Sequence, residues 1–151
     1  MASPLKIRAH HLLCLQGFQG YGYNDAFVEH LRGIVAEIKN HPALLIEVVT
    51  TCDAVCAGCP HCQKAECRKD PGAHRLMEMF DLTILKYTGI KPNHIAKAAS
   101  LLAQINTAFQ TRAQRAKICG ECQWRPICTW YLDSPTLANA STTDGTLRSV
   151  P

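Results

Sequence analysis

The clearest hydrophobic pattern in the chain is a helical one that begins after Asn24. Apolar side chains recur on one face there, at Phe27, Leu31, Ile34, Val35 and Ile38. Asn24 is a preferred N-cap residue, and His41-Pro42 interrupts the pattern at its other end. The spacing therefore predicts a helix over residues 25–39.

Two short stretches have the composition of strands. Residues 44–50 are apolar and rich in β-branched side chains, which predicts a buried strand that leads into the first cysteines. Residues 5–8 have room for an edge strand, and residues 10–15 for one or two helical turns.

The second half of the chain predicts further helices. Residues 73–87 form a broken helical pattern, with Asp81 as a second N-cap and Gly89 as a C-terminal stop. Pro92-Asn93 opens the next helix, and Thr111 caps a last short helix that runs into Cys119. The buried stripe predicted for the helix after Pro92 consists of Ile95, Ala99, Leu102, Ile105 and Phe109.

Together these elements predict an α+β fold: a predominantly helical, small single domain with one or two short strands and cysteine-rich metal-binding loops. The metal-binding domain spans residues 1–132. Residues 133–151 are rich in serine and threonine with few apolar anchors, and they predict a disordered tail. A chain of 151 residues can bury a sizeable core without a metal, so we expect a bound metal to do more than stabilise the fold.

Cysteine is the unusual feature of the composition. The hydrophobic fraction of 47% and the charged fraction of 19% are ordinary for a globular protein, but nine cysteines cannot all pair within one chain. The N-terminal residues lack the apolar segment of a secretory signal, and no run approaches the ~18 apolar residues of a membrane span. We therefore expect a cytoplasmic protein without a membrane partner, whose reduced thiols serve metal or redox chemistry.

The cysteines fall into two arrays. The closing array, Cys119-x2-Cys122-x5-Cys128, offers three thiolates from ten residues, whereas a tetrahedral or cubane centre needs four ligands. The upstream array consists of Cys52, Cys56, Cys59, Cys62 and Cys67. It approximates the bacterial ferredoxin run but departs from it in the last gap and in the place of the proline. We predict that this array supplies the fourth ligand, from Cys56 or Cys59.

Grouped thiolates at irregular spacing favour an iron–sulfur cluster of the [4Fe–4S] type as the cofactor. The alternative cofactor is zinc, held by the two C-x2-C pairs Cys56/Cys59 and Cys119/Cys122. A third arrangement has two sites, one for each array, in which Cys14 or His61 completes a set.

Other residues bear on such a centre. His10 and His11 are adjacent and would diverge by about 100° on a helix, so one suits the core and the other a ligand or proton carrier. Cys14 lies one turn further on, and a buried inert thiol is the simpler interpretation of it. Trp124 and Trp130 would shield the metal from water.

Lysine and arginine give the chain a net charge of +4. A denser basic run lies beside the closing array, at Arg112, Arg115, Lys117 and Arg125. We interpret this run as compensation for the negative thiolates, in preference to a nucleic-acid contact.

With these residues in view, the chain resembles a family of small prokaryotic proteins of unknown function, domain-of-unknown-function family 1284, whose members are described as candidate iron–sulfur binders. The resemblance covers residues 5–131. It rests on four segments: Arg8-Ala9-His10-His11-Leu12-Leu13-Cys14-Leu15, Gly17 through Tyr23, Cys56-Ala57-Gly58-Cys59-Pro60-His61, and Cys119-Gly120-Glu121-Cys122-Gln123-Trp124 with Cys128. Cys67 matches a further family position, while Cys52 and Cys62 look like additions. The predicted ligands are Cys56, Cys59, Cys67, Cys119, Cys122 and Cys128.

These residues support three functional hypotheses. The leading hypothesis is an iron–sulfur protein whose single cluster joins loops 52–67 and 119–128, with a structural or electron-transfer role and a redox protein as partner. The second is a zinc-stapled module that binds nucleic acid or protein. The third is a cluster-dependent enzyme that uses His10 or His11. The sequence leaves the substrate, the oligomeric state and the question of catalysis open.

Overall fold

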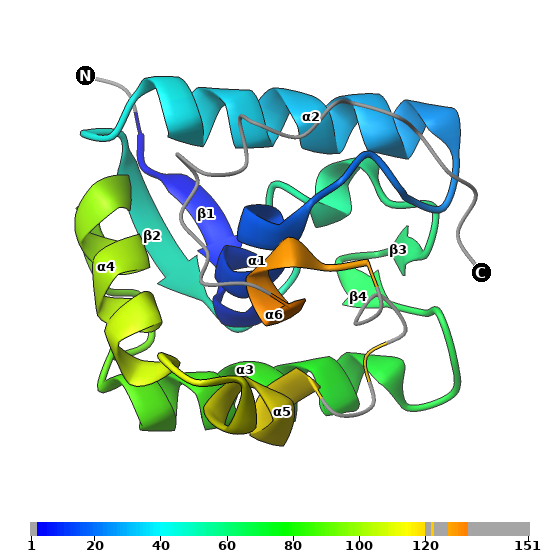
Figure 1. The fold of residues 1–151 in the computed structure, drawn as a ribbon. Coiled ribbons are helices and arrows are strands. Elements are labelled where there is room, and N and C mark those ends of the chain that lie inside the picture. Colours follow the sequence, from blue (N-terminus) through cyan, green and yellow to red (C-terminus); the bar gives the residue numbers. More distant parts are fainter. Residues whose placement is uncertain (1–2, 120–121, 123–126, 133–151) are drawn as a thin grey trace.

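The computed structural model describes residues 3–119, 122 and 127–132, and it shows a small sheet enclosed by helices (Figure 1). The predicted tail, residues 133–151, lies outside the described residues. Helix α2 (Asp25–Asn40) runs along one side of the molecule and α3 (Ala73–Thr88) along the opposite side, with the sheet and α1 (Ala9–Cys14) between them (Figure 1).

The sheet has the order β1-β2-β5. Strand β1 (Leu5–Arg8) pairs in parallel with β2 (Leu45–Val49), and β5 (Ile95–Lys97) pairs antiparallel with the other edge of β2. The two predicted strands are therefore present, and β1 lies at an edge as expected. Strand β2 is central, and its Ile46, Val48 and Val49 side chains are buried in the core.

Local capping explains several helix boundaries. Asn24 accepts a hydrogen bond at Oδ1 from the backbone N–H of Phe27 at 2.8 Å, so α2 begins where its N-cap predicts. The hydroxyl of Thr111 accepts one from the backbone of Gln114 at 3.1 Å and caps α5 (Arg112–Cys119). Helix α3 ends at Gly89, whose positive φ of 76° suits glycine.

Two predictions in the second half of the chain are wrong. Helix α3 is continuous, and Asp81 is a buried residue inside it, not an N-cap. Residues 95–97 form β5, and α4 (Ala98–Ala108) begins only after them. Ile95 pairs with Glu47 at the edge of β2 and is therefore part of the sheet. The buried residues of α4 are Ala98, Leu101 and Ile105, in place of the predicted stripe.

The remaining elements surround the cysteines. The first array contains the 3-10 turn η2 (Cys56–Gly58) and a small hairpin of β3 (Cys62–Gln63) and β4 (Glu66–Cys67). The 3-10 turn η1 (Leu15–Gly17) continues α1, and α6 (Thr129–Leu132) follows the closing array. The α+β, mostly helical fold class is confirmed, with more short strands than predicted.

A single apolar core holds these elements together. Its most deeply buried side chains include Ile7, Leu12, Ile46, Val48, Ile84, Leu101, Ile105, Phe109 and Trp130. Among the helices that the structure describes, none combines the length and apolar character needed to cross a bilayer.

Candidate metal centre

A buried charged network joins the end of β1 to α1 and α3. The guanidinium Nε of Arg8 donates to Asp81 Oδ2 at 2.7 Å, and both side chains are fully buried. The other carboxylate oxygen, Oδ1, accepts the backbone N–H of His10 at 2.9 Å and lies 2.6 Å from His10 Nδ1. One carboxylate in α3 therefore fixes the start of α1, the helix that carries His10, His11 and Cys14.

Protonation in this network follows from burial and charge. Burial, with the charge of His11, lowers the pKa of His10 to about 4, so His10 is neutral at pH 7 and its Nδ1–H donates to Asp81. Burial alone would raise the pKa of Asp81. Hydrogen bonding to His10 and the charge of Arg8 outweigh it, and the pKa lies below its usual range. Asp81 is therefore a buried anion.

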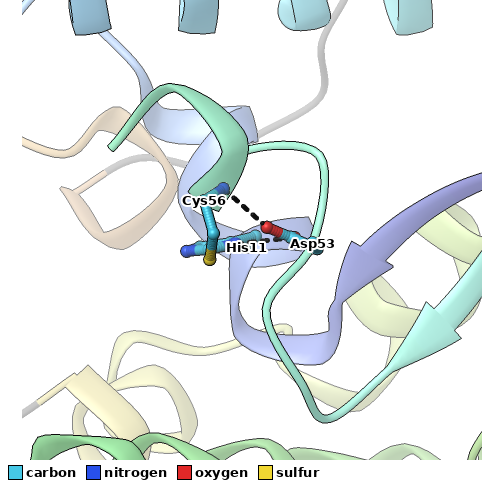
Figure 2. A group of neighbouring side chains, drawn as sticks. All are labelled: His11, Asp53 and Cys56. Carbon is cyan, nitrogen blue, oxygen red and sulfur yellow. Dashed lines mark hydrogen bonds and ion pairs between the residues drawn. The ribbon is translucent and has the colours of Figure 1, made fainter. Parts of the chain in front are cut away.

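A second carboxylate holds His11. Asp53 Oδ2 lies 2.8 Å from His11 Nδ1 and accepts the backbone N–H of Arg8 at 2.6 Å. Asp53 Oδ1 accepts the backbone N–H of Cys56 at 2.9 Å. One ligand atom each from His11, Asp53 and Cys56 lies within 4.8 Å of the others, and Figure 2 shows the sulfur of Cys56 over the end of the His11 ring that points away from Asp53. Nitrogen, oxygen and sulfur donors are thus grouped around one point, as in a metal site.

Electrostatics around Cys56 favour the neutral thiol in the metal-free protein. Burial, followed by the charge of Asp53, raises the pKa of Cys56. The pKa of Asp53 is lowered even though burial opposes this, because His11 and the two backbone N–H groups stabilise its charge. Nearby, Arg8 Nη1 is buried and has no hydrogen-bond partner.

Two more thiols of the first array lie beside Cys56. Cys62 Sγ is 3.3 Å from Cys52 Sγ, within hydrogen-bond distance for sulfur. The Cys52 side chain also interacts with Cys56. Burial and the hydrogen bond with Cys62 raise the pKa of Cys52 to about 11. Cys52 therefore interacts with both Cys62 and Cys56.

The other two thiols of this array, Cys59 and Cys67, lie near Tyr23. Burial raises the pKa of Tyr23 to about 12, with further contributions from the charges of Cys59, Cys67, Cys14 and Cys122. The backbone N–H of His61 donates to Cys59 Sγ at 3.4 Å. Cysteines of both arrays therefore act on Tyr23.

The closing array packs against the segment after α1. A Cβ added to Gly17 would collide with Cys128 Sγ and would lie 2.9 Å from the backbone nitrogen of Trp130. The amide of Gln19 donates to Thr129 Oγ1 at 3.2 Å. Gly17 is therefore what allows α6 and Cys128 to approach η1 closely.

All three cysteines of the closing array act electrostatically on Cys14. The residue is exposed to solvent, yet the surrounding chain is dense enough that burial is the largest cause of its raised pKa. The charges of Cys122, Cys128 and Cys119 raise that pKa further. Cys119 O accepts the backbone N–H of Cys122 at 3.0 Å. Cys14 therefore lies close enough to the three cysteines of the closing array for their charges to act on it.

A chain of hydrogen bonds fixes this arrangement. The indole Nε1–H of Trp130 donates to Asn106 Oδ1 at 2.9 Å, and the amide of Asn106 donates to Gln16 Oε1 at 2.9 Å. The amide of Gln16 in turn donates to Leu12 O at 3.0 Å, inside α1. These bonds connect α6, which follows Cys128, through α4 to the helix that carries Cys14.

The surroundings of the predicted residues overlap. Cys119, Cys122 and Cys128 act on Cys14, and Cys56 lies within 4.8 Å of ligand atoms of His11 and Asp53. Cys59 and Cys67 act on Tyr23, as do Cys14 and Cys122. Burial raises the pKa of the Cys128 thiol. The charge of Arg115, a buried member of the basic run, acts to lower it. The ring of Trp130 packs at 5.6 Å from that of Phe109. Trp124 and Arg125 lie outside the described residues.

Sequence reasoning missed the polar residues that support these sites, namely Arg8, Gln16, Asp53 and Asp81. Arg8 immediately precedes Ala9-His10-His11, and Asp53 lies between Cys52 and Cys56, so adjacency to candidate ligands was the available signal. No local pattern marks Asp81, which is 71 residues from His10 in sequence.

Comparison with known proteins gives a family without a known activity. Residues 22–128 match the model of the family described as "Protein of unknown function (DUF1284)". No curated protein and no solved structure matches the chain.

Proposed function

We propose that this chain, which belongs to the DUF1284 family, is an iron–sulfur protein that holds one [4Fe–4S]-type cluster on Cys14, Cys119, Cys122 and Cys128. The proposal rests on the proximity of Cys14 to the closing array, whose three cysteines act on its thiol and whose Cys128 packs against Gly17. Cys14 would then be the fourth sulfur of the closing array, in place of Cys56 or Cys59, because the Cys56 sulfur lies within 4.8 Å of ligand atoms of His11 and Asp53.

The donor set fits such a cluster. Four thiolates without a cation repel one another, which is part of the reason for the raised pKa of Cys14, and a cationic iron core would relieve this repulsion. Burial raises the pKa of Cys128, while the backbone N–H groups of Tyr131 and Trp130 and the charge of Arg115 act to lower it. Hydrogen bonds and charges near cluster sulfurs stabilise the cluster and tune its potential.

Electron transfer is the role that this geometry favours. A bound cluster would accept and release single electrons, and electron exchange needs an edge that a partner can approach. Cys14 is the exposed member of the set, so its edge of the cluster would face solvent and a redox protein partner. The basic side chains of α5, including Lys117, would suit an acidic surface on that partner.

The experiment is iron and acid-labile sulfide analysis of protein purified without oxygen, together with a visible spectrum. We expect about four irons and four sulfides per chain and the broad visible absorption of thiolate-bound iron. Zinc without sulfide, in protein that was never exposed to air and was expressed with ample iron, would contradict the proposal.

A further inference from the structure

We propose that Cys52 and Cys62 form a redox-active dithiol, which reacts with low-molecular-weight disulfides and closes into a Cys52–Cys62 disulfide. The two sulfurs are 3.3 Å apart, although the cysteines are ten positions apart in the sequence. A disulfide bond is about 2.0 Å long, so the sulfurs need to approach by only about 1.3 Å. Neither residue belongs to the four cysteines proposed to hold the cluster.

The surroundings of the pair suit this reaction. Both cysteines are partly exposed, whereas Cys56 is buried, so a small oxidant can reach them. Burial and the hydrogen bond with Cys62 raise the pKa of Cys52 to about 11. Cys52 is therefore a neutral thiol at pH 7, and the two sulfurs can stay in contact without charge repulsion.

The hairpin that carries Cys62 gives an independent reason to expect a tie. Strands β3 and β4 have two residues each, and a two-stranded hairpin by itself is marginally stable in water. The turn between them places Lys64 and Ala65 at positive φ, 52° and 60°, where asparagine and glycine are strongly preferred. A bond from Cys62 to Cys52 would anchor β3 to the loop after β2 and stabilise a turn that its own residues disfavour.

The reaction balances with a disulfide of the glutathione type as the oxidant. The thiolate of one cysteine attacks a sulfur of the small disulfide, which forms a mixed disulfide and releases one small thiol. The second cysteine then attacks the sulfur of the first, which closes the protein disulfide and releases the second small thiol. Two electrons pass from the protein dithiol to the small disulfide, and the two thiol protons end on the released thiols.

Closure should act on the hairpin and on the elements beside it. Strand β3 contacts η2, and β4 contacts α3, so the hairpin joins the first cysteine loop to a long helix. The backbone N–H of Arg68 donates to His61 O at 2.8 Å and extends the hairpin by one bond. We expect the disulfide to slow hydrogen exchange of this N–H by about tenfold, because it restricts local opening of the hairpin.

The test equilibrates the full-length protein, purified without oxygen, with excess glutathione disulfide and then maps its linkages by mass spectrometry. Cleavage on the amino side of Asp53 separates Cys52 from Cys62, so a disulfide between them holds two peptides together. We expect this linked pair in most chains, with fragmentation placing the bond on Cys62, and we expect dithiothreitol to remove it.

Single variants test the two partners. Cys52→Ala and Cys62→Ala should each abolish the linkage and leave the remaining thiol as a mixed disulfide with glutathione. Cys67→Ala is the matched control, because Cys67 lies opposite Cys62 in the hairpin but is not a proposed partner. That variant should form the Cys52–Cys62 linkage as the unmutated protein does.

The mapping of the unmutated protein decides the proposal without relying on the folding of any variant. Cys52 and Cys62 that remain unlinked after equilibration, or a bond from Cys62 to Cys67 in place of Cys52, would overturn it. Iron and acid-labile sulfide, measured before the oxidant is added, test the cluster separately, since neither cysteine is a proposed cluster ligand.

Discussion

Asp81→Asn should be severely destabilising, although it only replaces one carboxylate oxygen with an amide NH2 group. The Asp81 carboxylate accepts the Nε–H of Arg8 and two bonds from His10, and the ion pair has no solvent exposure. The amide keeps the shape but leaves the Arg8 guanidinium as an uncompensated buried charge. Breaking a buried ion pair from one side costs about 3–5 kcal/mol.

Thermal and urea unfolding of the metal-loaded protein, followed by circular dichroism without oxygen, measures this loss. For a domain of this size each 1 kcal/mol corresponds to about 2–4 °C in Tm, so we expect a decrease of roughly 6–20 °C. Because Asp81 fixes the start of α1, the variant should also release metal at a lower temperature than the unmutated protein.

The control is Glu29→Ala, which removes the partner of Arg32 in an exposed ion pair on α2. That change should alter stability by no more than about 0.5 kcal/mol. The double variant Arg8→Met/Asp81→Asn removes both charges and should lose less stability than the two single changes added together. If Asp81→Asn is as mild as Glu29→Ala, the buried network does not hold α1 in place.

Two glycine substitutions should have opposite effects. Gly17→Ala places a methyl group against Cys128 Sγ and the Trp130 backbone, so we expect a lower Tm and less iron retained per chain after gel filtration. Gly33→Ala lies inside α2, where an added Cβ meets nothing within 4 Å, and it should stabilise the protein by about 0.5–1 kcal/mol in urea unfolding without changing its iron content. Equal iron retention in both variants would contradict the close approach of α6 to η1.

Local sequence signals accounted for the elements that depend on local chemistry. The N-caps Asn24 and Thr111 and the C-terminal stop at Gly89 act through neighbouring backbone groups, so their sequence context was sufficient. The predicted helix at residues 95–97 was wrong because strand pairing with β2 outweighed the helical pattern that continues after them. The role predicted for Asp81 was wrong because its partners, Arg8 and His10, lie more than 70 residues away in the sequence.

Sequence alone indicated which cysteines could bind a metal, but not which of them lie near one another in the fold. Clustered cysteines indicated thiolate chemistry, and the Cys119-Cys122-Cys128 spacing already required a fourth ligand. Which upstream thiol meets that array depends on the packing of α6 against η1 through Gly17, and sequence spacing carries no such information. The pairing of His11 with Asp53 is likewise a tertiary contact, 42 residues apart.

The most direct test of the cluster assignment is a comparison of iron and acid-labile sulfide in Cys14→Ala and Cys56→Ala, both prepared without oxygen beside the unmutated protein. Cys14 is exposed, so its truncation should leave no cavity. We predict that Cys14→Ala loses most of its iron and sulfide while Cys56→Ala retains them. Full retention in Cys14→Ala together with loss in Cys56→Ala would contradict the assignment and return the fourth ligand to the first cysteine array.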